Sequence, residues 1–239
     1  MFELELKQEN HIKIIKVKSW DFPHGFIDKS LDFKLDNKAW KSFSSTELLL
    51  LNQVHGKEII EFKNDACREG DGWISNLDKL SSENLSLGIK TADCSPVIVF
   101  GQSKKLIAVL HCGWRSAYAG ILKDCIKKFL EQGEKNSEIE IAIGPAAQGE
   151  SYEIGLDLVE KLESNLESSL ESSNAIKKIV EGEKAGKYFL SISDYLTSQA
   201  NTLGVKRIIS SDICTMKNEN YFSHRRQGLK SGRQLTFVG

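Results

Sequence analysis

A cysteine and a histidine lie at the outer ends of two apolar runs in the stretch TADCSPVIVFGQSKKLIAVLHCGWR, residues 91–115. The runs PVIVF and LIAVLH are rich in apolar and β-branched residues and are joined by the polar GQSKK, so a β-hairpin is predicted. A four-residue loop, GQSK, places Cys94 opposite His111, whereas a five-residue loop pairs Cys94 with Cys112. Opposed Cβ atoms lie about 5 Å apart, a separation at which one metal ion can bind both a thiolate and an imidazole.

A third candidate ligand is His55, which ends another apolar run in NQVHG. With Cys94 and His111 it makes a set of two histidines and one cysteine, and three protein ligands with one open position are typical of catalytic zinc. Structural zinc sites favour four ligands in close pairs, and the sequence has no CxxC or HxxxH pair. His24 and His224 are also available as ligands.

Two other roles for Cys94 and His111 remain open at the level of sequence. In the first, Cys94 is a small buried hydrophobic residue and His111 a hydrogen-bonded histidine at a strand end. In the second, Cys94 is the nucleophile of an amide hydrolase and His111 is its base. Carboxylates for proton transfer are Asp93, next to Cys94, and Asp71 in the DGW turn, although a turn-forming role is favoured for Asp71.

Arg115 follows His111 closely and suggests an anion site. Ser116 is predicted to cap a helix over SAYAGILKDCIKKFLEQG, and free N–H groups at a helix start beside a guanidinium suit phosphate or carboxylate. The alternative is that Arg115 covers Trp114 or pairs with a surface acid. Further guanidinium groups come from the basic segment SHRRQGLKSGR near the end of the chain, although such a segment is usually a solvated tail; they belong to Arg225, Arg226 and Arg233.

The elements that position these residues alternate between strand and helix patterns. Strands are predicted in HIKIIKVKSW, LLLLNQVHG, LSLGIK, IEIAIG and RIISSDIC, and helices in residues 156–170 and 193–205. The Ser-, Glu- and Lys-rich stretch 171–187 is expected to be a mobile connection. Because no repeat and no clear linker interrupts the pattern, the predicted fold is a single α+β domain over residues 1–239.

Composition narrows the classes of function. The chain has 239 residues, 40% of them hydrophobic, which suffices for a sizeable core, and no run reaches the roughly 18 apolar residues of a membrane span. Its 32 Lys and Arg residues nearly balance 33 Asp and Glu residues, so neither nucleic acid nor a membrane surface is an expected partner.

The numbers and spacing of cysteine and histidine residues indicate the cellular compartment and the kind of metal site. The start MFELELKQEN lacks the features of a signal peptide, and five scattered cysteines suit a reducing compartment, so the protein is expected in the cytoplasm. The five histidines include no HxH pair, which argues against a multicopper oxidase. Weak phenol oxidation by a single copper in the site of His55, Cys94 and His111 is still compatible with the sequence.

Several blocks resemble the YfiH/laccase-domain family, whose members are also called polyphenol oxidases or purine nucleoside phosphorylases: NQVHG, TADCSPVIVF, HCGWRSAYAGI, IAIGPAAQGESYEIG and YFSHRRQG followed by SGR. The resemblance runs from PHGF at residues 23–26 to the C-terminus. It implies a mixed α/β layered fold with helices flanking mixed sheets and a metal site at His55, Cys94 and His111, for which the donors suggest zinc, with copper as the alternative. It further implies phosphorolysis of adenosine, inosine and methylthioadenosine, with phosphate as co-substrate, and adenosine deamination.

The sequence departs from this family at three places. The family commonly follows PHGF with Ser-x-Arg-x-Gly-Gly, but this chain continues IDKSLDF and lacks that arginine. Ala146 stands where the family usually has a cysteine, and His224 where it often has a tyrosine. The first departure affects the expected substrate pocket, and the last brings His224 into consideration as a residue near the site.

Overall fold

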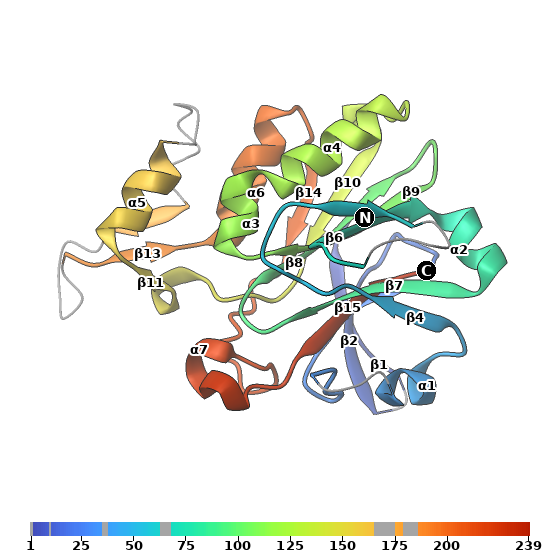
Figure 1. Ribbon diagram of the computed structural model, residues 1–239, viewed down its shortest axis with the longest axis horizontal. Coiled ribbons are helices and arrows are strands. Elements are labelled where there is room, and N and C mark those ends of the chain that lie inside the picture. The colour runs from blue at the N-terminus through green and yellow to red at the C-terminus, as the bar shows by residue number, and fades with distance from the viewer. Residues whose placement is uncertain (1, 10, 35–37, 63–67, 165–174, 179–185) are drawn as a thin grey trace.

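The computed structural model describes residues 2–9, 11–34, 38–62, 68–164, 175–178 and 186–239. Its strands form two six-stranded sheets and one three-stranded sheet within these residues (Figure 1). The first sheet comprises, in spatial order, β1 Leu4–Glu9, β2 Ile12–Val17, β3 His24–Ile27, β15 Gln234–Val238, β7 Leu85–Thr91 and β4 Glu47–Leu50. The second comprises β14 Arg207–Ser210, β10 Ile139–Ile143, β8 Ser95–Gly101, β9 Leu106–Cys112, β6 Gly72–Asn76 and β5 Ile59–Glu61. The small third sheet has the order β11 Glu153–Ile154, β13 Tyr188–Leu190 and β12 Ile176–Lys178.

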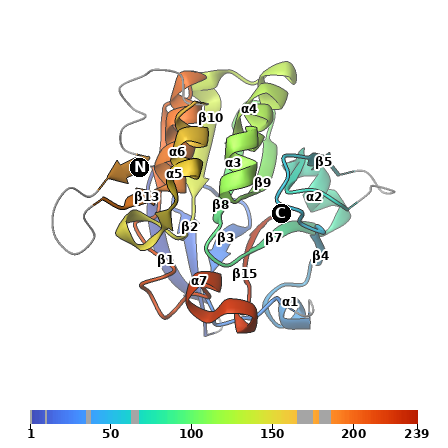
Figure 2. The ribbon, with the colours of Figure 1, turned by 60° about the vertical axis from the view of Figure 1, so that its left-hand side comes forward.

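Helices cover the outer faces of the two large sheets. Figure 2 shows α3, α4 and α6 over the second sheet, while α1 lies at the far end of the first sheet. The helices are α1 Lys38–Phe43, α2 Leu77–Glu83, α3 Trp114–Ala119, α4 Ile121–Glu131, α5 Leu156–Glu163, α6 Ile192–Thr202 and α7 His224–Gln227. Among the described residues, no helix combines the length and the apolar character needed to cross a membrane.

The alternation of side chains along β8 shows how these layers are held together. Val97 and Val99 join the core beneath the helices, whereas Ile98 between them joins the core between the two sheets. A third core lies on the other face of the first sheet, where Trp40 of α1 packs with Phe237 of β15 at a ring separation of 4.9 Å. A strand can serve two cores because successive side chains point to opposite faces. The predicted layered α/β architecture is confirmed.

The hairpin over residues 95–112 is confirmed, but its register differs from both predicted registers. The loop has four residues, Gln102–Lys105, one position later than GQSK, so Pro96 is opposite His111 and Ser95 is opposite Cys112. The predicted pairs of Cys94 with His111 and with Cys112 are therefore wrong. The observed register differs by two residues from the one predicted for the GQSK loop. A shift of two residues keeps each side chain on its predicted face of the sheet.

The helix after this hairpin also differs from the prediction. It begins at Trp114 with Gly113 as its N-cap, so the prediction of Ser116 as N-cap is wrong. Gly120, with a φ of 88°, ends α3 and separates it from α4. A glycine suits this break because a positive φ is costly for residues that carry a Cβ. Arg115 is consequently the second residue of a short helix rather than the residue before one.

The end of the chain is not a solvated tail. After α7, strand β15 lies in the interior of the first sheet, hydrogen-bonded between β3 and β7. The predicted helix over residues 156–170 is present as α5, and its residues 165–170 lie outside the described part of the chain, as does most of the expected connection 171–187. Within that connection, residues 176–178 form β12.

Candidate active site

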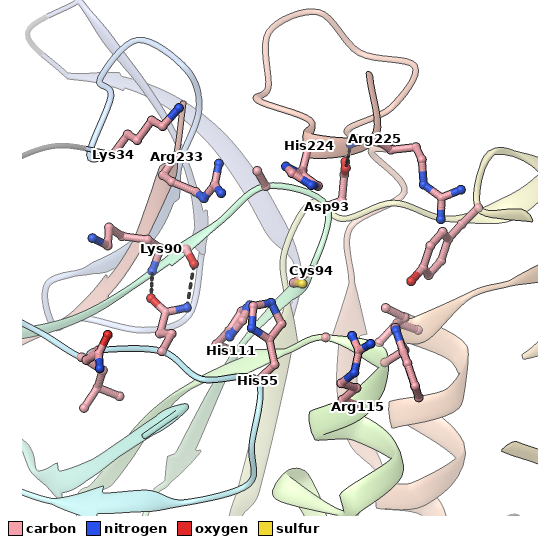
Figure 3. A pocket seen from close by; sticks show the side chains of 18 residues that line it. Lys34, His55, Lys90, Asp93, Cys94, His111, Arg115, His224, Arg225 and Arg233 are labelled. Atoms are coloured by element: carbon pink, nitrogen blue, oxygen red, sulfur yellow. Dashed lines mark hydrogen bonds between the residues drawn. The ribbon is translucent and has the colours of Figure 1, made fainter. Parts of the chain in front are cut away.

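A cavity of about 570 Å³ opens where the chain crosses from the first sheet to the second. Strand β7 ends at Thr91 and β8 begins at Ser95, so the three residues between them form this crossing. Figure 3 shows side chains from β9, α3, α7 and the segment after β4 turned toward the same space. Residues that are distant in sequence thus line one cavity because the two sheets meet here.

His55, Cys94 and His111 converge in this cavity. One ligand atom from each residue lies within 4.8 Å of the other two, and the two imidazole rings are 4.8 Å apart at 75° (Figure 3). Among the described residues, no other group of three His, Cys, Asp or Glu side chains gathers in this way. The set of candidate ligands predicted from the strand ends is therefore brought together.

The convergence of Cys94 and His111 depends on Gly113. The register of β8 and β9, continued by one step, places Cys94 opposite Gly113 rather than His111. A Cβ atom on Gly113 would lie 3.1 Å from Cys94 Sγ and 3.4 Å from His55 Cδ2. Because glycine has no side chain, the thiol can occupy the space beside His111, which projects from the same face.

Asp71 fixes the orientation of His111. The residue precedes β6, and the register of β6 and β9 places it directly opposite His111. Its Oδ1 lies 2.7 Å from His111 Nδ1, so His111 donates this proton and directs Nε2 toward Cys94 and His55. The turn-forming role favoured from sequence is replaced by that of a cross-strand partner.

The same carboxylate organises the segment that carries His55. Asp71 accepts hydrogen bonds from the backbone N–H groups of Val54, His55 and Gly56, at 3.3, 3.0 and 2.6 Å. His55 has a φ of 61°, a conformation that costs about 1 kcal/mol or more for a residue with a side chain. The three hydrogen bonds hold His55 in this conformation, so one buried acid positions two of the three candidate ligands.

Cys94 and His111 form a coupled pair of ionisable groups. Burial acts to raise the pKa of Cys94, but the charge of His111 and hydrogen bonds from both histidines lower it to about 6. Burial acts to lower the pKa of His111, but Cys94 and Asp71 raise it to about 9. The cavity thus favours the thiolate at neutral pH, which is the form that binds metals and attacks electrophiles.

This donor set fits a transition metal. Two imidazoles and a thiolate suit zinc or copper, and a histidine held by a carboxylate through its other nitrogen is the usual arrangement around such ions. With three protein ligands, a bound metal would keep an open position for water or substrate.

Positively charged side chains surround the three candidate ligands. Arg115 and Arg225 lie on one side of the cavity in Figure 3, with their guanidinium groups 4.3 Å from the ring of Trp114 and 5.2 Å from the ring of Tyr152. On the other side lie Lys34, Lys90 and Arg233. The cavity is therefore cationic although the chain as a whole has a formal net charge of −1.

Arg226 is not brought to the cavity. Its guanidinium donates hydrogen bonds to four backbone carbonyls, at 2.6–3.5 Å, in the segment that precedes α7. This arginine holds the segment together, whereas its neighbour Arg225 lines the cavity. The adjacent positions thus differ in role because α7 turns their side chains in different directions.

Asp93 lines the cavity, but its carboxylate is occupied by hydrogen bonds. It accepts from the hydroxyl groups of Thr215 and Ser223, at 2.7 and 3.1 Å, and from the backbone N–H of Arg225 at 2.7 Å. The residue has a φ of 84°. Asp93 therefore ties the start of α7 to the cavity wall, and this anchoring leaves little capacity for proton transfer.

The remaining histidines and several residues absent from the sequence analysis can now be placed. His24 is buried elsewhere, where its ring accepts from the N–H of Val17 at 2.8 Å, while His224 lines the cavity (Figure 3). Sequence reasoning missed the cavity lysines Lys34 and Lys90, because neither lies in a recognised motif. It gave no functional role to Trp114 and Tyr152, although both lie in blocks that resemble the family.

Comparisons with known proteins agree with this description. A family model described as multi-copper polyphenol oxidoreductase laccase matches residues 35–239. A protein of Aquifex aeolicus named purine nucleoside phosphorylase is 31% identical over 223 residues, which cover 91% of this chain and 96% of the relative. A purine nucleoside phosphorylase of Clostridium acetobutylicum is 30% identical over 205 residues, or 84% of this chain and 79% of the relative.

Solved structures share the fold. YfiH of Bacillus licheniformis has a TM-score of 0.81 at 20% identity, covering 97% of this chain and 99% of that chain. YlmD from Geobacillus stearothermophilus has a TM-score of 0.79 at 22% identity, covering 99% of both chains. The family predicted from the sequence blocks is confirmed. Because its model spans most of the sequence, the chain belongs to the multi-copper polyphenol oxidoreductase laccase family, which includes the YfiH proteins.

Proposed function

We propose that this protein is a metal-dependent purine nucleoside phosphorylase that acts on adenosine, inosine and methylthioadenosine and also deaminates adenosine. The observation that carries the proposal is the union in one cavity of a metal-binding triad, His55, Cys94 and His111, with the guanidinium groups of Arg115 and Arg225. The relatives of Aquifex aeolicus and Clostridium acetobutylicum, both named purine nucleoside phosphorylase, support the assignment.

In phosphorolysis, a phosphate oxygen bonds to C1′ of the ribose while the bond from C1′ to the purine nitrogen breaks. The enzyme must therefore hold an anion and a flat base in one space and keep them correctly oriented. Arg115 and Arg225 supply charge-assisted hydrogen bonds to the phosphate, and the half-buried rings of Trp114 and Tyr152 offer flat surfaces for the purine. The guanidinium groups would also stabilise the negative charge of the phosphate throughout the reaction.

The metal would be held by His55, Cys94 and His111, with Asp71 orienting His111. When bound, it supplies Lewis acidity beside the cavity, which is the chemistry that activation of water for deamination requires. Zinc is the proposed metal, and copper is the alternative that the same donors accept. A single copper would support weak phenol oxidation as a side activity.

A second candidate function is supported by the spatial arrangement of Cys94, His111 and Asp71. A thiolate with a pKa of about 6, an adjacent imidazole and a carboxylate 2.7 Å from that imidazole reproduce the arrangement of nucleophile, base and orienting acid. In this alternative the protein is an amide hydrolase or deamidase, with Cys94 as nucleophile and no metal on the thiolate.

The decisive experiment combines metal analysis of purified protein with a phosphate-dependent nucleoside assay. We expect about one zinc per chain and release of purine base that requires inorganic phosphate. Cys94→Ser should abolish both metal retention and turnover, because a hydroxyl is a far poorer zinc ligand than a thiolate. Cys214→Ser is the matched control, since Cys214 is also partly exposed but lies outside the triad.

Alkylation separates the two candidate functions. A metal-bound Cys94 should react slowly with iodoacetamide until the metal is removed by a chelator, whereas a free catalytic thiolate should react at once. Full nucleoside turnover by Cys94→Ser would refute the metal-dependent phosphorylase, and full amide hydrolysis by the same variant would refute the second candidate, because each reaction gives this sulfur an essential role.

A further inference from the structure

The proposed phosphorolysis uses the cations on one side of the cavity and leaves a second cationic group unassigned. Lys34, Lys90 and Arg233 line the opposite side, and in Figure 3 the triad of His55, Cys94 and His111 lies between them and Arg115. Two groups of cations thus line one cavity, on opposite sides of the triad in this view.

The register of the first sheet explains how Lys90 and Arg233 come together. Lys90 of β7 is directly opposite Leu235 of β15, so Arg233, two residues before Leu235, projects from the same face on the diagonal. Diagonal neighbours on adjacent strands lie about 7–8 Å apart, within reach of long side chains, so the two positive charges of Lys90 and Arg233 repel each other. The fold therefore retains an unfavourable pair of cations at the rim of the cavity.

Among the described residues, no carboxylate forms an ion pair with the side chain of Lys90 or Arg233. Asp32 lies close by, but it accepts hydrogen bonds from the backbone N–H groups of Lys34 and Arg233, both at 2.9 Å. Lys90 is half-buried, and its pKa is lowered by burial and by the charge of Arg233, with no acid acting in the opposite direction. Arg233 donates to the backbone carbonyls of Ser231 and Gly232, at 3.1 and 2.8 Å, and forms no ion pair with a described acid. A half-buried cation pair of this kind is stabilised when an anion binds between the two groups.

Backbone hydrogen bonds fix the positions of these cations relative to the triad. Gln53 receives the N–H of Lys90 and donates to its carbonyl, both at 2.8 Å, which ties Lys90 to the segment that carries His55. The N–H of Phe33 donates to the carbonyl of Arg233 at 2.9 Å, and this bond places Lys34 beside Arg233. The three cations are thus held by the same scaffold as the triad.

We infer that Lys34, Lys90 and Arg233 form a second anion subsite, which binds the 5′-phosphate of a purine nucleoside 5′-monophosphate. The inference rests on the proposed function and extends its substrate class: the nucleoside 5′-monophosphate is preferred to adenosine, inosine and methylthioadenosine, none of which carries a 5′-phosphate. Inorganic phosphate occupies the side of Arg115 and Arg225, the 5′-phosphate occupies the side of Lys90, and the ribose spans the space between them.

The reaction balances with the reactants already assigned. An oxygen of inorganic phosphate bonds to C1′, the C1′–N9 bond breaks, and its electron pair leaves with the purine, which takes up a proton. The products are the free base and ribose 1,5-bisphosphate. No oxidant or reductant is consumed.

The test compares inosine with inosine 5′-monophosphate as substrates of the metal-loaded protein at fixed inorganic phosphate, measuring release of hypoxanthine. We expect wild-type kcat/KM to be higher for the nucleotide by about tenfold or more, since charge-assisted hydrogen bonds to a phosphate are strong.

Lys90→Gln should lower the ratio of nucleotide to nucleoside kcat/KM by about tenfold. Lys34→Gln should lower the same ratio. Because Lys34 lies outside the regular strands, this variant keeps the test valid if Lys90→Gln fails to fold. Lys16→Gln is the matched control: Lys16 is a half-buried strand lysine outside the cavity, and this change should leave the ratio unaltered.

Each outcome decides between the two proposals. Phosphate-dependent turnover of inosine without turnover of the nucleotide would overturn the second subsite and leave the proposed function intact. A raised KM for inorganic phosphate in Lys90→Gln, equal for both substrates, would also overturn it, because Lys90 would then bind the co-substrate. If neither compound is turned over, the proposed function fails, and calorimetric titration then tests the second subsite alone. Tighter binding of the nucleotide than of the nucleoside, lost in Lys90→Gln, would support the subsite. Equal binding of the two compounds would overturn it.

Discussion

Asp71 is the residue on which the geometry of the site depends most. Its carboxylate accepts one hydrogen bond from the ring of His111 and others from the backbone around His55, and burial makes the carboxylate inaccessible to solvent. The acid therefore selects the tautomer of His111 and the conformation of His55 together. One carboxylate thus holds both His55 and His111 in place in the absence of a metal.

Asp71→Asn should lower metal affinity by about 10- to 100-fold, as loss of comparable partners of metal-bound histidines does. The amide can donate to Nδ1 of His111, which favours the tautomer with a proton on the nitrogen that faces Cys94. Competition with a chelator of known affinity measures the loss. Asp78→Asn, at an exposed ion pair with Lys105, is the control that should keep native affinity. Native metal affinity in Asp71→Asn would show that the hydrogen bond to His111 is dispensable.

As the proposed phosphate ligand, Arg115 offers a test that separates phosphorolysis from deamination. Removing its guanidinium in Arg115→Ala should raise KM for inorganic phosphate by about tenfold or more, because a charge-assisted hydrogen bond is lost. Adenosine deamination, which uses water in place of phosphate, should fall less. Steady-state kinetics of both reactions measure the difference, with exposed Arg68→Ala as the control. Equal losses in the two reactions would mean that Arg115 positions the nucleoside or supports the fold.

At the scale of elements, the junction of β9 with α3 determines how closely Cys94 approaches the histidines. Gly113 has a φ of −74° and a ψ of 170°, values that any residue can adopt. Its importance therefore comes from the missing side chain and not from backbone freedom. The space above Gly113 holds the thiol of Cys94.

Gly113→Ala should disturb the triad while leaving the backbone unstrained. The new methyl group would lie 3.1 Å from Cys94 Sγ, so the sulfur must shift by a few tenths of an ångström. We expect weaker metal binding and lower turnover with nearly native thermal stability, measured by chelator competition and calorimetry. In Gly56→Ala the added Cβ would have its nearest contacts at 3.6 Å, an ordinary contact distance, so this control should bind metal normally. Unchanged metal affinity in Gly113→Ala would show that the triad tolerates displacement of the sulfur.

At the scale of the whole molecule, the cavity exists because two sheets pack against each other. An aromatic cluster joins them: Trp20 and Phe22 from the segment before β3 contact Phe100 of β8, at ring separations of 5.6 and 4.9 Å. His24 packs against Trp20 at 5.0 Å within this cluster. The neutral form of a buried histidine is therefore part of the contact between the sheets.

This arrangement predicts a loss of stability in mild acid. Burial lowers the pKa of His24 from 6.5 to about 4, so between these values the unfolded chain binds a proton that the folded chain does not. The stabilisation is complete above about pH 6.5 and is lost toward pH 4, at about 1.4 kcal/mol per pH unit. Denaturant unfolding of wild type and His24→Gln at several pH values should show a shallower slope in the variant. Identical slopes would assign the acid sensitivity to other groups.

The sequence by itself determined the features that depend on near neighbours. Two apolar, β-branched runs joined by a polar loop predicted the hairpin of β8 and β9. The positions of His55, Cys94 and His111 at the ends of apolar runs identified the candidate ligands. Of the two loop lengths left open, the four-residue loop is the one observed, and the displacement of its register by two residues left the side-chain faces unchanged. These features follow from local periodicity and turn preferences, which a short window of sequence contains.

Tertiary structure alone decided the partners of these residues. Asp71 meets His111 across 40 positions of sequence, and Lys90 lies near Arg233 because β15 enters the first sheet beside β7. Nothing near either residue in the sequence indicates these pairings, since the choice among possible strand neighbours depends on how all the apolar faces are buried at once. The sequence therefore predicted which residues could bind a metal. The acid that orients two of these residues and the cations that surround all three are brought there by the packing of the two sheets.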